Sequence, residues 1–174
     1  MNRRSFLKVG LAAALLSIAL SLPQLHQAHA GPLTNFLENA LVDHVFRGTA
    51  YTAPGTLYVS LHTAACSDSS TGTEVTGGSY ARVAVTSNGT NWANTQASGT
   101  GVSSGTSGTT SNSGAITFPS PTANWGLVTH FGIFDASTSG NQILCQALTV
   151  SKTINDGDAA PSFAGGALTI QLDN

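Results

Sequence analysis

The run of apolar and aromatic residues from Trp125 to Ala136 constrains the fold of this chain more than any other feature. It reads Trp-Gly-Leu-Val-Thr-His-Phe-Gly-Ile-Phe-Asp-Ala and lies between two turn-rich regions. Alternation from residue 127 to residue 134 puts apolar side chains on both faces of a strand, Leu127, Phe131 and Ile133 on one and Val128 and Phe134 on the other. Such a pattern is typical of a strand that is covered on both sides. We therefore predict that residues 127–134 form the central strand of the fold.

The first thirty residues predict a cleaved export signal and not a part of the fold. A basic start precedes an apolar run over residues 9–22, and Ala28-His29-Ala30 has the small-x-small pattern of a cleavage site. These 14 positions are too few to span a bilayer as a helix, which needs roughly 20 residues. We expect no stable membrane anchor, and no lipid anchor either, because no cysteine follows the apolar run.

The basic start is similar to a twin-arginine export signal, a type that carries proteins already folded. The residues that carry this similarity are Arg3, Arg4, Phe6, Leu7 and Lys8, with Asn2 where serine is more usual. An ordinary signal for export of the unfolded chain is the alternative. Either signal predicts that residues 31–174 reach the periplasm, the cell surface or the medium.

The charge of the exported part argues against two classes of partner. Residues 31–174 carry three Lys and Arg side chains against eight Asp and Glu, a net charge of −5. Nucleic acids and anionic membrane surfaces bind clustered cations, so neither is an expected partner. The 144 residues of this part suit a single domain with its own core.

Two cysteines, Cys66 and Cys145, lie in the exported part. An oxidising compartment lets such a pair persist as a disulfide. A bridge across residues 66–145 would stabilise the fold by on the order of 4 kcal/mol through loop closure in the unfolded chain. Two separate buried thiols are the alternative.

One helix is expected, from about Asn35 to Arg47. Asn35 is the predicted N-cap, with Glu38 at the spacing of a capping box, and Gly48 can end the helix. One stripe of this helix is mainly apolar and should lie on a sheet, since no second amphipathic helix exists to pair with it: Leu33, Leu37, Ala40, Leu41, His44 and Val45.

Six short strands are expected, at residues 56–63, 80–86, 115–118, 127–134, 143–150 and 167–172. Together with one N-terminal helix they predict a mainly β fold, an antiparallel β-sandwich or open barrel with the helix packed on it. Residues 97–114 are rich in Gly, Ser and Thr, and too poor in apolar groups to offset the entropy of ordering them. They predict an exposed flexible loop within this one domain.

Catalytic and metal-binding patterns are weak. Gly101-Val102-Ser103-Ser104-Gly105 has the spacing of a nucleophile elbow but lacks the strand before it and the helix after it. His62 and His130 could approach each other across a sheet as zinc ligands, but Asp135 is an odd number of residues from His130 and should point to the opposite face. We interpret His130 as a buried structural residue, and we expect no metal, no cofactor and no catalytic residues.

Ligand binding is the other chemistry that we considered. Aromatic faces suit sugar stacking, and Trp92, beside the flexible loop, is a better exposed candidate for a glycan than Trp125, which heads the core strand. Asp156 and Asp158 could hold calcium, but a solvated turn explains them without a ligand.

Several motifs, in order, resemble small tailed-phage virion proteins, the tail-fibre or tail structural proteins. They are Leu33 to Asn39, Asp43 to Arg47, Thr73 to Arg82, Trp125 to Ala136 (with Trp125, His130, Phe131, Gly132, Phe134 and Asp135 as its core), Thr153 to Asp158 and Phe163 to Ile170. The resemblance implies a β-rich structural module without catalytic residues, which assembles with itself or with other virion parts. The export signal, the two cysteines and the expanded Gly/Ser loop depart from the family pattern.

Three functions follow as hypotheses. The first is a secreted, non-enzymatic structural protein that self-assembles into a surface or extracellular fibre, with copies of itself or other surface or virion-like proteins as partners. The second is a monomeric adhesin or carbohydrate-binding module that uses Trp92. The third, an exported hydrolase, would require Ser103 or His130 to act in catalysis.

Overall fold

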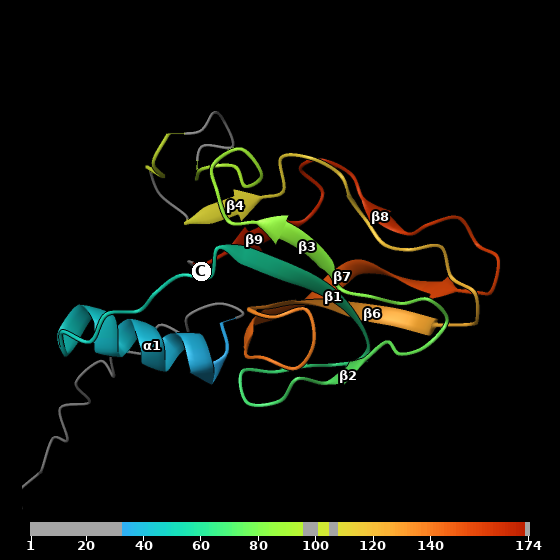
Figure 1. Ribbon diagram of the computed structural model, residues 1–174, viewed down its shortest axis with the longest axis horizontal. Helices are drawn as coiled ribbons and strands as arrows, with labels where there is room; N and C mark the ends of the chain where they lie inside the picture. The colour runs from blue at the N-terminus through green and yellow to red at the C-terminus, as the bar shows by residue number, and fades with distance from the viewer. Residues whose placement is uncertain (1–32, 96–100, 105–107, 173–174) are drawn as a thin grey trace, which may run out of the picture.

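The computed structural model describes residues 33–95, 101–104 and 108–172. Its helix and strands are α1 (Asn35–Phe46), β1 (Thr56–Ala64), β2 (Thr73–Glu74), β3 (Val83–Thr86), β4 (Thr109–Ser111), β5 (Ile116–Thr117), β6 (Gly126–Phe134), β7 (Gln142–Ile154), β8 (Ser162–Phe163) and β9 (Thr169–Gln171). Figure 1 shows their arrangement. The residues of the expected export signal, Arg3, Arg4, Phe6, Leu7, Lys8, Ala28 and Ala30, lie outside the described ranges.

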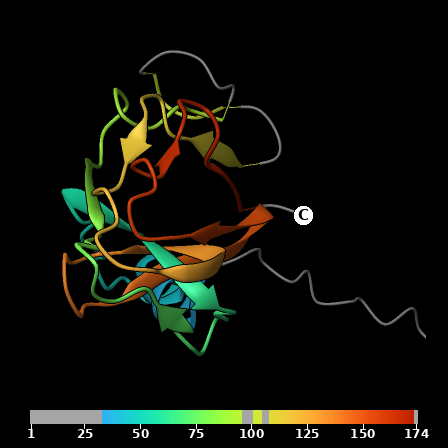
Figure 2. The same ribbon diagram turned by 90° about the vertical axis from the view of Figure 1, so that its right-hand side faces the viewer.

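The main sheet is antiparallel and has the order β2-β1-β6-β7, with β3 paired to the same edge of β1 as β2. Two small ribbons, β4–β9 and β5–β8, lie across from it (Figure 2). The apolar core fills the space between the layers: Val59, Leu61, Phe131 and Ile133 come from the main sheet, and Ile116, Phe118, Leu168 and Ile170 from the ribbon side. The prediction of a mainly β, antiparallel fold with one helix is confirmed, and the described sheets do not close into a barrel.

Strand β6 is central, as predicted, and pairs with β1 on one side and β7 on the other. The predicted alternation holds from His130 to Phe134 but fails before it. The register with β7 shifts between Val128 and His130, and such an irregularity exchanges the two faces of a strand. Val128 therefore joins the core, whereas Leu127, which we expected to be buried, is 51% exposed.

The helix begins one residue away from the predicted cap. Thr34 is the N-cap, and no side chain caps the helix, because the Thr34 hydroxyl donates instead to the carbonyl oxygen of Gln142 on β7. Of the predicted apolar stripe, Leu37 packs against the core, but Leu41 and Val45 are exposed. The helix thus touches the sheet at its start and extends away from it (Figure 1).

The end of the expected flexible loop is ordered. Thr109–Ser111 forms β4 and pairs with β9, and the Thr110 hydroxyl donates to the carbonyl oxygen of Ala93 at 2.6 Å. A three-residue strand is too short to be read from sequence alternation, and it exists because a partner strand is present. Residues 97–100 and 105–107 of that segment lie outside the described ranges. No helix in the described part of the chain is long and apolar enough to cross a membrane.

Candidate functional site

The side of the main sheet that faces away from the apolar core is polar and also buried. Cross-strand pairing puts Ser60 of β1, Gly132 of β6 and Cys145 of β7 side by side, with the His62–His130 pair next to them. Ser60 and His62 have no exposed surface. We call this set, together with Gln142, the buried polar face. The prediction that the central strand is covered on both sides is confirmed for residues 131–134, although one of the two faces is largely polar, and it fails at Leu127.

Gly132 allows three polar side chains to meet above β6. A Cβ atom at this position would lie 2.8 Å from each of Ser60 Oγ, His62 Nε2 and Gln142 Nε2. Real Cβ atoms do not approach other heavy atoms so closely. The glycine of the His-Phe-Gly segment is therefore explained by this close approach, and a larger residue would push the cluster apart.

Ser60 and His62 form a pair that sequence reasoning missed. Their Oγ and Nε2 atoms lie 2.8 Å apart, the separation of a nucleophile and its base. Burial lowers the pKa of His62 from 6.5 to about 4; Glu74 opposes this shift, and Arg82 and His130 add to it. The imidazole is neutral at pH 7 and could act as a base, but neither side chain is accessible to a substrate. Only the period-two spacing of Ser60 and His62 hinted at the pair.

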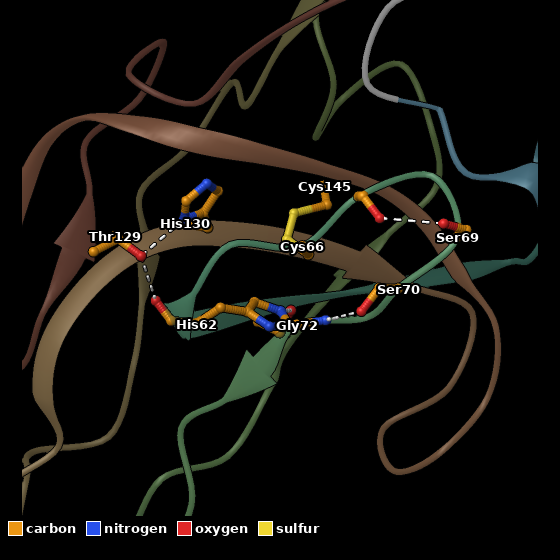
Figure 3. The surroundings of a disulfide bond; sticks show 10 residues. His62, Cys66, Ser69, Ser70, Gly72, Thr129, His130 and Cys145 are labelled. Atoms are coloured by element: carbon orange, nitrogen blue, oxygen red, sulfur yellow. Dashed lines mark hydrogen bonds between the residues drawn. A yellow bond between two sulfur atoms is a disulfide. The ribbon is translucent and has the colours of Figure 1, made fainter.

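His130 has a structural partner. Its Nδ1 lies 2.8 Å from the hydroxyl of Thr129, and it pairs with His62 across the two strands (Figure 3). The side chain is half-buried. Among the described residues no group of three His, Cys, Asp or Glu side chains is placed to hold a metal ion.

A disulfide between Cys66 and Cys145 covers the buried polar face. Its Cα atoms are 6.0 Å apart, and it ties the loop after β1 to the first half of β7 (Figure 3). A hydrogen bond from the backbone N–H of Asn35 to the carbonyl oxygen of Asp68, at 2.8 Å, joins the same loop to the start of α1. The bridge thus holds this loop against the sheet at the place where the helix begins.

The Thr73 to Arg82 motif forms a charged cluster at the edge of this face. Arg82 donates to both carboxylate oxygens of Glu74, at 2.8 and 2.7 Å, and Tyr80 donates to Glu74 at 2.9 Å. Burial would raise the pKa of Glu74, but the hydrogen bonds from Arg82 and Tyr80 lower it below its usual 4.5. The Tyr80 hydroxyl also accepts from the backbone N–H of Leu61, and burial raises its pKa.

Arg82 also joins this cluster to the turn after β6. Its guanidinium donates to the carbonyl oxygens of Ala136 and Ser139, both at 2.8 Å, and lies 3.5 Å from the centre of the Phe134 ring. Asp135 closes the same turn by accepting from the backbone and side-chain amides of Asn141, at 2.7 and 2.8 Å. Every polar atom of this guanidinium is thereby engaged within the fold.

Trp125 links the Thr73 to Arg82 motif to the Trp125 to Ala136 motif, and we call the residues of these two motifs the signature residues. Its indole N–H donates to the carbonyl oxygen of Gly78 at 2.9 Å, and its ring meets Tyr80 edge to face at 5.3 Å. Gly78 has a φ of +53°, and a Cβ there would lie 2.9 Å from the indole nitrogen. The prediction that Trp125 is a packing residue is confirmed by its burial.

The other candidates from the sequence do not gather into one site. Trp92, expected to be exposed for a glycan, is half-buried and packs against the core, because its strand-like segment bridges to Asn112. Ser103 lies in irregular chain, where its hydroxyl accepts from the backbone N–H of Thr95 at 3.2 Å. Asp158 closes a turn by accepting from the backbone N–H of Asn155 at 2.7 Å.

A known protein family matches nearly all of the residues that the structure describes. The family model described as podophage GP4 fiber I protein gp80 matches residues 32–171. None of the curated proteins matches the chain at a significant level. The match covers the helix, both sheet layers and every signature residue described above. The chain belongs to the family of the podophage fiber I protein gp80, and its module is that of a structural, phage-fibre-like protein.

Proposed function

We propose that this chain is an exported structural subunit that self-assembles, without catalysis, into a fibre at the cell surface or outside the cell. The family match over residues 32–171 carries the proposal. It is supported by the way the signature residues are used, since Arg82, Glu74, Asp135 and Trp125 all contact other parts of the same domain. Such contacts hold these four side chains in fixed positions within the domain.

Assembly is tested with the protein recovered after export. Size-exclusion chromatography with light scattering over a range of concentrations, followed by negative-stain microscopy, should find oligomers that grow with concentration and thin filaments. A strict monomer at every concentration, with no filaments, would contradict self-assembly. A glycan array on the same sample decides whether the chain is instead a carbohydrate-binding module.

Export is tested separately. Replacing Arg3 and Arg4 with lysine should retain the protein in the cytoplasm if the signal is of the twin-arginine type. The matched control is Lys8→Arg, which keeps the charge of the start and should leave export unchanged. Export of the double lysine variant at the normal rate would favour an ordinary signal.

A further inference from the structure

The molecule carries two exposed apolar surfaces, a ridge on α1 and a groove beside β7 and β8. The ridge is formed by Leu41, Val42, Val45 and Phe46, which are 37, 49, 64 and 81% exposed. Val42, Val45 and Phe46 follow Leu41 by one, four and five residues, so the four side chains form one continuous face of the helix. The contact between the start of α1 and β7 buries none of these four side chains.

The second half of β7 and the β8 segment line a groove of about 190 Å³. Most of the side chains that line it are apolar: Phe118 and Val128 are buried, Leu148 and Phe163 are partly buried, and Val150 is 77% exposed. A cavity of about 150 Å³ is enough to hold a benzene molecule. The groove can therefore accept an aromatic side chain.

Apart from Asp43 and Arg47, which pair with each other at 2.7 Å, one charged side chain borders each surface, and the two have opposite signs. Glu38 precedes Leu41 and Val42 by three and four residues and so borders the ridge. Lys152 borders the groove, and no acidic residue lines it. Neither Glu38 nor Lys152 has an ion-pair partner within the described residues.

A molecule cannot place its own ridge in its own groove. Thr34, immediately before α1, is bound to the first residues of β7, and the groove lies at the last ones. Nine residues of strand span roughly 30 Å, and α1 extends in the opposite direction (Figure 1). The two surfaces can therefore meet only between different copies of the chain.

We propose that the ridge of one copy docks in the groove of the next, with Phe46 as the central side chain and Glu38 facing Lys152. This proposal rests on the self-assembly proposed above and adds the contact that produces it. The contact joins unlike surfaces, and a contact of this kind does not stop at a dimer but continues as a ring or a filament. A helix laid in an apolar groove is a common mode of recognition.

Two single variants test the contact, each at a residue whose exposure leaves the fold intact. Phe46→Asp removes the ridge and Val150→Asp removes the groove, and each should raise the concentration needed for assembly by about thirtyfold or more, as loss of a central interface residue does. Leu127→Asp, at an exposed apolar residue outside both surfaces, is the matched control and should assemble normally. Circular dichroism verifies that all three are folded.

Mixing the two variants gives the sharper result. Phe46→Asp keeps an intact groove and Val150→Asp keeps an intact ridge, so an equimolar mixture should form dimers and nothing longer. The charge exchange Glu38→Lys with Lys152→Glu should restore part of the assembly that either change alone weakens. Normal assembly of Phe46→Asp or of Val150→Asp, or a mixture that stays monomeric, would overturn this contact. If either of these results is found while the unmodified protein assembles, self-assembly stands and only the proposed contact is wrong. If the unmodified protein never assembles, both the self-assembly and the contact are wrong.

Discussion

The two faces of the main sheet are both buried, but different forces hold them. One face packs Val59, Leu61, Phe131 and Ile133 against the two ribbons. The other packs Ser60, His62, Gly132 and Gln142 under a loop and a disulfide. Apolar burial is non-directional and tolerates small changes of shape, whereas buried polar groups require partners at fixed positions.

The polar face has a cost that the apolar face does not have. Both side-chain amide atoms of Gln142 are buried without a hydrogen bond to the described residues, and an unsatisfied buried group costs about 1–3 kcal/mol. The disulfide and the Arg82–Glu74 cluster stand at the borders of this face and offset such a cost. The apolar face is thus the source of stability, and the polar face depends on its covalent and ionic borders.

The largest effect is expected on the apolar face. Phe131→Ala should lower the free energy of unfolding by about 4 kcal/mol, because it removes a buried ring and leaves a cavity. Chemical denaturation measures it. Leu127→Ala, on the same strand but half exposed, is the control and should cost under about 1 kcal/mol. Equal losses for the two would mean that Phe131 is not part of the core.

Next in size is the removal of the bridge that covers the polar face. The double variant Cys66→Ser/Cys145→Ser should lose about 3–4 kcal/mol, since the cross-link closes a long loop in the unfolded chain. Alkylation of the unmodified protein without reductant, followed by mass spectrometry, should find no free thiol. Two free thiols in the native protein would show that Cys66 and Cys145 are not bridged.

A smaller loss is expected within the polar face itself. Gly132→Ala should destabilise by about 2–3 kcal/mol, because the added methyl group overpacks Ser60, His62 and Gln142. Gly55→Ala is the matched control: nothing lies within 4 Å of its Cβ position, and its effect should be near zero. Thermal unfolding of the two variants makes the comparison, and a neutral Gly132→Ala would refute the close approach.

The smallest effect depends on pH. Folding lowers the pKa of His62 from 6.5 to about 4, so the unfolded chain binds more protons between these values and stability falls as the pH drops. Between pH 7 and pH 5 the loss from His62 is about 2 kcal/mol. His62→Gln should flatten this part of the stability curve, while the acid loss due to Glu74, whose pKa is also lowered, remains. An unchanged slope in the variant would assign the titration to other groups.

Predictions from sequence succeeded where one segment carries its own signal. The central strand, the five other predicted strands and the helix are all present, because period-two and helical patterns are local. The short strands β2, β4 and β8 were missed, because their segments show no alternating apolar pattern and they are ordered by their partner strands. Trp92 and the helical stripe were misjudged because exposure depends on neighbours distant in sequence.

The sequence by itself determined the β-rich class, the central strand and the family, since all three follow from the order of residues along the chain. Only the tertiary structure decided which face of that strand is polar, that Gly132 brings Ser60 and His62 together, and that α1 leaves its apolar ridge exposed. The physical reason is that burial and close approach are properties of pairs of segments. A register shift at Val128 was enough to move Leu127 from the core to the surface.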